Sequence, residues 1–230
     1  MRGHQLALPV QLRDSASFET FYAGPNPDTV AALRALSTDV FVYGALNSGK
    51  SHLLQAAARV HGAGYLPLAQ LAEVGPEVLA GYDNAPALCL DDIDAVCTDR
   101  QWCYALLRVL DALRARGARC CIAAAGAPER MDIAVPDLRT RLAACAVFGL
   151  KPLSDDDRAE LLRERAQGRG LELAEESTRW LLAHLPRDAG SLIEALEQLD
   201  RASLREQRRL TLPFVQATLR ASAGAHTTPG

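Results

Sequence analysis

The segment Gly44-Ala45-Leu46-Asn47-Ser48-Gly49-Lys50-Ser51 matches the phosphate-loop pattern G-x-x-x-x-G-K-[ST] at every position. In such a loop, backbone N–H groups surround phosphate oxygens, and the dipole of the following helix adds positive potential. Lys50 would reach the outer phosphates, and the Ser51 hydroxyl would ligate Mg²⁺. The residues expected to bind the nucleotide here are Gly44, Asn47, Ser48, Gly49, Lys50 and Ser51.

Two acids follow an apolar run that begins at Ala87 and is typical of a buried strand. Asp91 and Asp92 would therefore lie at the carboxyl edge of a parallel sheet, where nucleotide sites are found. We expect Asp91 to contact the cofactor and hold Mg²⁺, and Asp92 to act in catalysis by orienting or activating the attacking water. The alternative is that both are solvated loop acids.

These residues require an α/β scaffold. Apolar runs predict strands at 39–43, 65–68, 87–90, 119–125 and 146–150, and helical spacing predicts helices at 50–61 and 101–116. Strands that alternate with helices indicate a parallel five-stranded sheet flanked by helices. Only helical patterns follow Leu150, so we expect a small all-α domain there. The expected divisions are 1–26 (head), 27–150 (α/β core), 151–223 (helical lid) and 224–230 (disordered tail).

Composition excludes several classes of protein. The chain has 230 residues, of which 49% are hydrophobic, and a net charge of −3. Neither the part up to Leu150 nor the part after it has an excess of basic residues. The chain therefore lacks the electrostatic footprint of an autonomous duplex-DNA binder. No apolar run approaches the ~20 residues that a membrane helix needs. The six cysteines form no C-x-x-C pair, which favours free thiols in a reducing cytoplasm over a metal or redox site.

Several short segments, in order, resemble those of AAA+ ATPases related to the bacterial initiator DnaA. Phe21–Asn26 resembles an F-x-x-G-x-N segment of these proteins, and Leu90–Ile93 resembles their acidic box. Pro136–Leu142 resembles their arginine-finger box. Two later stretches, Leu199–Ser203 and Leu210–Val215, resemble the end of the lid in the family of the DnaA regulatory inactivator, Hda. The resemblance implies a P-loop AAA+ core followed by a helical lid.

The resemblance also extends to the start of the chain. Residues Gln5-Leu6-Ala7-Leu8-Pro9 are similar to the Q-L-x-L-P peptide by which this family binds the sliding clamp (the β subunit of DNA polymerase III). In an extended peptide, two leucines can enter a hydrophobic groove while a glutamine amide makes polar contacts. The residues expected to bind the clamp are Gln5, Leu6, Leu8 and Pro9. The alternative is an edge strand of the core.

Within the arginine-finger box, Arg141 is the expected catalytic finger acting in trans, with Arg139 as the alternative. A guanidinium that enters a neighbour's site can accelerate hydrolysis by ~10³–10⁵. The positions that match the family's two phosphate sensors hold Ala125 and Gly190, which have no polar side chain. Arg187, three residues before Gly190, would lie one helical turn away and is a candidate substitute. We therefore expect nucleotide binding with little hydrolysis by this chain alone.

The function implied by the resemblance is negative regulation of replication initiation in the cytoplasm. The chain would hold ADP or ATP with Mg²⁺, bind the clamp, contact DNA only through the clamp, and stimulate ATP hydrolysis by its partner DnaA. The sequence leaves open whether the chain forms a homodimer. Two alternatives remain: a self-sufficient ATPase of the helicase-loader type, and a nucleotide-independent replication adaptor. Steady-state ATP turnover by the chain without partners would indicate the first alternative. Effects on the partner that survive Lys50→Ala would indicate the second.

Overall fold

The chain forms two compact units, which divide between Lys151 and Pro152. The computed structural model describes residues 16–225. The elements of the first unit are α1 (Pro27–Ala35), β1 (Val40–Tyr43), α2 (Lys50–His61), β2 (Gly64–Pro67), α3 (Leu68–Leu71), β3 (Ala87–Asp91), α4 (Arg100–Ala115), β4 (Arg119–Ala124), α5 (Pro136–Ala143) and β5 (Ala146–Gly149), with short 3₁₀ turns at Pro76–Leu79, Tyr82–Asn84, Ile93–Ala95 and Pro128–Arg130. Those of the second unit are α6 (Asp155–Gln167), α7 (Glu175–His184), α8 (Ala189–Glu206) and α9 (Leu212–Ala225).

The five strands form one parallel sheet in the order β2-β3-β4-β1-β5. This confirms the predicted α/β class and the parallel five-stranded sheet. The strand limits differ by a residue or so from the prediction. Leu68 begins α3 instead of ending β2, while Ala125 and Leu150 lie just past β4 and β5.

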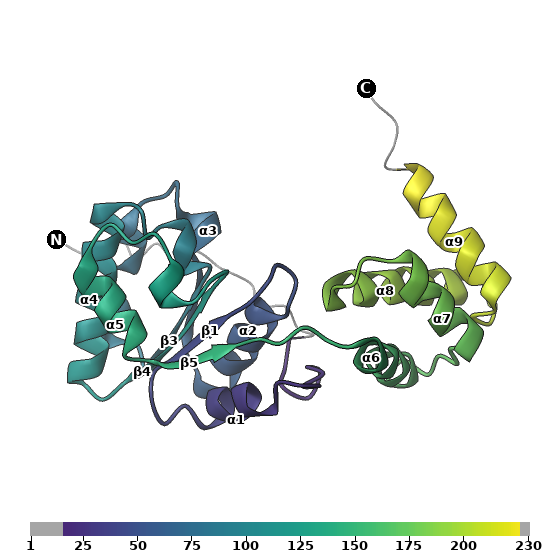
Figure 1. Ribbon diagram of the computed structural model, residues 1–230, viewed down its shortest axis with the longest axis horizontal. Coiled ribbons are helices and arrows are strands. Elements are labelled where there is room, and N and C mark those ends of the chain that lie inside the picture. The colour runs from purple at the N-terminus through teal and green to yellow at the C-terminus, as the bar shows by residue number, and fades with distance from the viewer. Residues whose placement is uncertain (1–15, 226–230) are drawn as a thin grey trace. The chain divides into compact units, whose positions relative to one another are not determined.

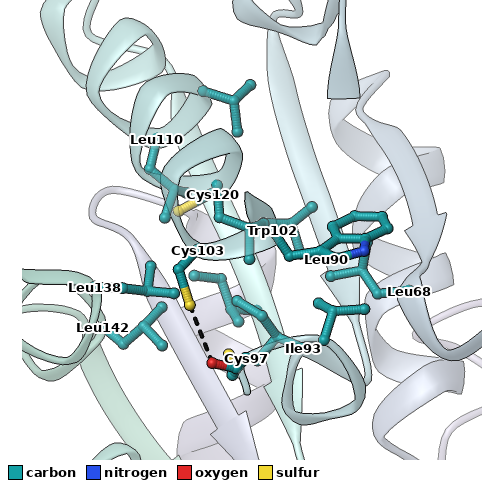
Figure 2. Close-up of a cluster of buried hydrophobic side chains, with 14 of the residues drawn as sticks. Leu68, Leu90, Ile93, Cys97, Trp102, Cys103, Leu110, Cys120, Leu138 and Leu142 are labelled. Atoms are coloured by element: carbon teal, nitrogen blue, oxygen red, sulfur yellow. Dashed lines mark hydrogen bonds between the residues drawn. The ribbon is translucent and has the colours of Figure 1, made fainter. Parts of the chain in front are cut away.

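Side chains that alternate along the strands build two cores, one on each face of the sheet (Figure 1). Cys89 and Cys121 face the core formed with α1 and α2, whereas Leu90 and Ile122 face the core formed with α4 and α5. Figure 2 shows part of this second core, in which the Cys103 thiol donates a hydrogen bond to the carbonyl of Cys97. The helices thus cover both faces of the sheet and exclude water from them.

The second unit is helical throughout and has its own core. Buried side chains from all four helices and from the loop before α9 meet in it: Leu162, Leu181, Leu192, Leu199, Ala202, Leu210, Phe214 and Val215. A capping box starts α6, since the Ser154 hydroxyl accepts a hydrogen bond from the N–H of Asp157 and the Asp157 carboxylate accepts one from the N–H of Ser154. No helix in residues 16–225 has the length and apolarity to cross a membrane.

Candidate functional site

The phosphate-loop residues lie between the carboxyl end of β1 and the start of α2. Two of them adopt left-handed backbone angles, Asn47 with φ 58° and Gly49 with φ 95°. Gly49 is the N-cap of α2, so the helix N-terminus opens directly at the loop. Left-handed residues alternating with right-handed ones turn successive N–H groups to one side and make an anion-binding concavity.

Both loop glycines are closely approached by neighbouring side chains. A Cβ on Gly49 would lie 2.7 Å from Cε2 of Phe21, and one on Gly44 would lie 2.9 Å from Oγ of Ser48 and 3.1 Å from Cβ of Leu150. A side chain at Gly44 would have to displace these neighbours, whereas at Gly49 the left-handed backbone also disfavours any other residue. Phe21 comes from the F-x-x-G-x-N segment, which therefore packs against the phosphate loop.

Lys50 lies in the first turn of α2 with a buried side chain. Its Nζ donates hydrogen bonds of 2.9 Å to the carbonyl oxygens of Gly44 and Ala45, both in the same loop. These two bonds hold the ammonium against the first residues of the phosphate loop. Ser51 is the next residue on α2 and is half-buried.

The loop also contains a polar atom that lacks a protein partner. The Oγ of Ser48 is buried, and no group in the described part of the chain forms a hydrogen bond with it. An unpaired buried hydroxyl is costly unless a ligand or water satisfies it. This orphan hydroxyl, the two glycine contacts and the helix N-terminus together fit a bound phosphate.

Asp91 is the last residue of β3 and is fully buried. Its Oδ2 accepts a 2.6 Å hydrogen bond from the hydroxyl of Tyr65 on β2, and its Oδ1 accepts one of 3.2 Å from the N–H of Asp92. Strand pairing explains the first contact, since Tyr65 lies opposite Cys89, two residues before Asp91 on the same face of the sheet. Tyr65 could not be predicted as a site residue, because nothing in its local sequence pattern distinguishes it from a core residue.

Asp92 follows in a left-handed conformation, with φ 54°, and begins the 3₁₀ turn at Ile93–Ala95. Burial, together with the nearby carboxylates of Asp91 and Asp94, raises the pKa of Asp92, and the positive charge of Lys50 opposes this rise. The two acids therefore differ. Asp91 is fully buried at the end of β3, whereas Asp92 is half-buried and interacts electrostatically with Lys50.

No group of three or more histidine, cysteine or acidic side chains suited to a metal occurs in residues 16–225. Mg²⁺ does not require such a group, because it commonly binds one or two protein oxygens together with phosphate oxygens and water. Ser51 and Asp91 provide oxygens of the type that Mg²⁺ prefers. The residues present thus fit a metal that arrives with a nucleotide.

The two positions predicted to match the phosphate sensors lack polar side chains, but one has an acid beside it. Ala125 follows β4, and its N–H donates a 3.3 Å hydrogen bond to Oδ1 of Asp94. The idea that Arg187 lies one helical turn before Gly190 is wrong, because α8 begins only at Ala189, after the N-cap Asp188. The Arg187 side chain is exposed on the preceding turn.

The two arginines of the predicted finger box lie on α5. Arg141 forms an ion pair with Asp111 of α4, and its side chain is 28% exposed. Arg139 donates a 3.3 Å hydrogen bond from Nη1 to the carbonyl of Glu129. Both guanidiniums thus have partners within the first unit. The predicted clamp-binding residues, Gln5, Leu6, Leu8 and Pro9, lie outside the described residues.

An AAA+ fold combines four features that this chain has: a parallel sheet in this strand order, a phosphate loop between β1 and α2, paired acids after β3 and a following helical unit. Residues 155–219 match the family model described as "Hda, lid domain". The chain superposes on domain III of the Thermotoga maritima replication initiation protein DnaA with a TM-score of 0.78 and 19% identity, over 92% of this chain and 98% of that one. The chain therefore has a DnaA-like AAA+ fold, and its second unit matches the Hda lid domain.

Other solved structures share this fold. DnaA from Aquifex aeolicus, in a structure bound to AMPPCP, superposes with a TM-score of 0.67 and 20% identity, over 86% of this chain and 70% of that one. A Thermotoga maritima RuvB structure superposes with a TM-score of 0.71 and 14% identity, over 92% and 73% of the two chains. At these identities the superpositions establish the fold alone.

Proposed function

We propose that this chain is a negative regulator of replication initiation that binds ADP or ATP with Mg²⁺ and stimulates ATP hydrolysis by DnaA in trans. The observation that carries this proposal is the combination of a DnaA-like AAA+ fold with a second unit that matches the Hda lid domain over residues 155–219. Relatives of this fold include a DnaA structure bound to AMPPCP, which supports an adenine nucleotide as the ligand.

The geometry of the phosphate loop supports nucleotide binding. Lys50 is already held against the first residues of the loop, and the buried Ser48 hydroxyl lacks a protein partner. The loop N–H groups and Lys50 would bind phosphate oxygens, while Ser51 and Asp91 would hold the metal. Mg²⁺, when bound, would neutralise charge on the phosphates.

Little hydrolysis by the chain alone is expected from its sensor positions. Ala125 offers only a methyl group and a backbone N–H, and the N–H is bonded to Asp94. Gly190 has no side chain at the start of α8. Without donors aimed at the charge that develops on the phosphates, Asp92 could position water but the transition state would lack stabilisation.

Action in trans would come from Arg141. Its guanidinium would leave Asp111 and enter the partner's site, where it would neutralise charge on the transferring phosphoryl group. The Asp111 side chain is 52% exposed, and ion pairs that water can reach contribute only about 0–1 kcal/mol, so the pair with Asp111 is a weak competitor for this role. Arg139 is the alternative finger.

The remaining parts of the proposal rest on the sequence resemblance. Residues 5–9 would bind the sliding clamp, and contact with DNA would be indirect, through the clamp. The protein would act in the cytoplasm at the replisome, and it could also form a homodimer.

The test is ATP hydrolysis by purified DnaA, measured with and without this protein and with clamp loaded on DNA. We expect acceleration that requires both this protein and the clamp, is lost with Arg141→Ala, and is lost with a double change of Leu6 and Leu8 to Ala. The absence of acceleration, with turnover by this chain alone, would support a loader-type ATPase. Acceleration that survives Lys50→Ala would support a nucleotide-independent adaptor.

A further inference from the structure

A chain of three polar side chains connects the phosphate-loop helix to the acid at the end of β3; the outer two are buried and the middle one is half-buried. Nε2 of Gln55, on α2, donates a 3.3 Å hydrogen bond to the hydroxyl oxygen of Tyr65 on β2. That hydroxyl donates in turn to Oδ2 of Asp91, on β3, at 2.6 Å. Three separate elements thus meet around a single carboxylate.

The direction of donation in this chain is determined by its chemistry. The amide nitrogen of Gln55 can only donate, so it uses a lone pair of the Tyr65 oxygen and leaves the hydroxyl proton for Asp91. Burial and the adjacent carboxylate of Asp91 raise the pKa of Tyr65 above its ordinary value. The phenol therefore remains protonated and donates throughout the physiological pH range.

Packing alone does not explain a tyrosine at this position. Phenylalanine would fill the same volume between α2 and β2, but Asp91 is fully buried and would lose one of its two hydrogen bonds. A buried carboxylate has room for about four hydrogen bonds or metal contacts, so two donors leave capacity for a further partner. The hydroxyl thus restricts the orientation of the carboxylate without filling its coordination capacity.

We propose that Tyr65 is a positioning residue that orients Asp91 for Mg²⁺-nucleotide binding, with Gln55 orienting Tyr65 in turn. The proposal rests on the proposed function, because it assumes that Asp91 acts on the metal that accompanies the nucleotide. It extends that function by assigning a role to a strand residue outside both sequence motifs. Outer partners of metal-binding carboxylates typically change metal affinity by ~10–100-fold when removed.

The test is Tyr65→Phe in the full chain, with ADP binding measured by calorimetry in excess Mg²⁺ and again in EDTA. We expect the enhancement of ADP affinity by Mg²⁺ to fall by ~10-fold or more. Affinity in EDTA should stay unchanged, because the phosphate loop itself is intact. Equal losses with and without Mg²⁺, or no loss in either, would overturn the proposal, because a purely structural role gives no selective loss of the metal effect.

Tyr104→Phe is the matched control, since it removes an exposed hydroxyl on α4 that accepts a hydrogen bond from Arg100. Gln55→Met is a second variant that retains Tyr65; it should weaken the Mg²⁺ effect in the same direction but less, and no effect would count against the relay. In an Asp91→Asn background, Tyr65→Phe should cause no further loss of Mg²⁺ enhancement. If the wild-type chain binds ADP without any Mg²⁺ effect, the proposed metal site fails as well, whereas a normal wild-type effect unchanged in Tyr65→Phe rejects this inference alone.

Discussion

The side-chain amide of Asn26 forms two hydrogen bonds with the backbone of Lys151, which lies 125 residues further along the chain. Its Oδ1 accepts from the N–H of Lys151 at 2.7 Å, and its Nδ2 donates to the carbonyl of Lys151 at 3.1 Å. Asn26 is buried and ends the F-x-x-G-x-N segment. The pair ties the beginning of the described first unit to its last residue.

Loss of this pair should destabilise the first unit. Asn26→Ala removes both part-buried hydrogen bonds to the backbone of Lys151, and each such bond contributes about 0.5–1.5 kcal/mol. We expect a lower unfolding midpoint by thermal denaturation. Asn84→Ala is the control, because its partner Arg116 is exposed, and it should change stability little. An Asn26→Ala midpoint equal to that of the wild type would contradict the argument.

The two lysines of the chain should behave differently when their charge is removed. Lys50→Met keeps the apolar stem but removes the ammonium from the phosphate loop, so nucleotide affinity should fall by about 10- to 100-fold, as expected for charged hydrogen bonds. Lys151→Met is the control, because the side chain of Lys151 is exposed and only its backbone bonds to Asn26. Calorimetric titration with ADP checks both. Equal affinities for the two variants would count against the phosphate-loop role.

Release of Arg141 from its internal partner should favour action in trans. Asp111→Asn removes the carboxylate of the ion pair, and since such pairs contribute about 0–1 kcal/mol, stimulation of DnaA hydrolysis should rise by up to about fivefold. Arg141→Ala should lower stimulation by ~10³-fold or more, whereas Arg139→Ala should not. The readout is phosphate release at saturating partner. A large loss only in Arg139→Ala would reassign the finger.

Asp92 should make stability depend on pH. Its pKa is raised above the ordinary value of 3.8, mainly by burial and by Asp91. Between the unfolded and folded pKa values the folded state binds more protons, so the contribution of Asp92 to the free energy of unfolding falls as pH rises through this range. Asp92→Asn removes this loss, and asparagine tolerates the left-handed backbone.

The measurement for Asp92 is urea denaturation of both proteins at about pH 4 and pH 7. We expect the free energy of unfolding of Asp92→Asn, relative to that of the wild type, to be higher at pH 7 than at pH 4. A difference that stays the same at both pH values would show that the carboxyl does not titrate in this range.

Most cysteine thiols should be unreactive in the folded protein. All six are free, and Cys145 alone is not fully buried. Interaction with Cys121 and burial raise the pKa of Cys89, and burial raises that of Cys97 to about 12. Titration with a thiol reagent should label at most one thiol quickly before denaturation and six afterwards. Cys145→Ser should abolish the fast reaction; rapid labelling of several thiols would contradict the buried assignments.

The sequence predicted those features that depend on neighbouring residues. Phosphate-loop chemistry is contained in eight consecutive residues, and its strand-to-helix context follows from local hydrophobic periodicity. For the same reason the position of Asp91 and Asp92 after a buried strand was predictable. The α/β class and the helical second unit also followed, because period-2 and period-3.6 patterns can be recognised over short windows.

The contacts that give these residues their surroundings depended on tertiary structure. Tyr65 meets Asp91 because β2 pairs with β3 in register, and Arg141 meets Asp111 because α5 packs against α4. Local spacing gave Arg187 a helical position, yet the capping of α8 by Asp188 leaves it outside the helix. Such partners are far apart in sequence, and only the strand order and the packing of helices on the sheet bring them together. Sequence therefore determined which groups are available for chemistry, and the fold determined what each group touches.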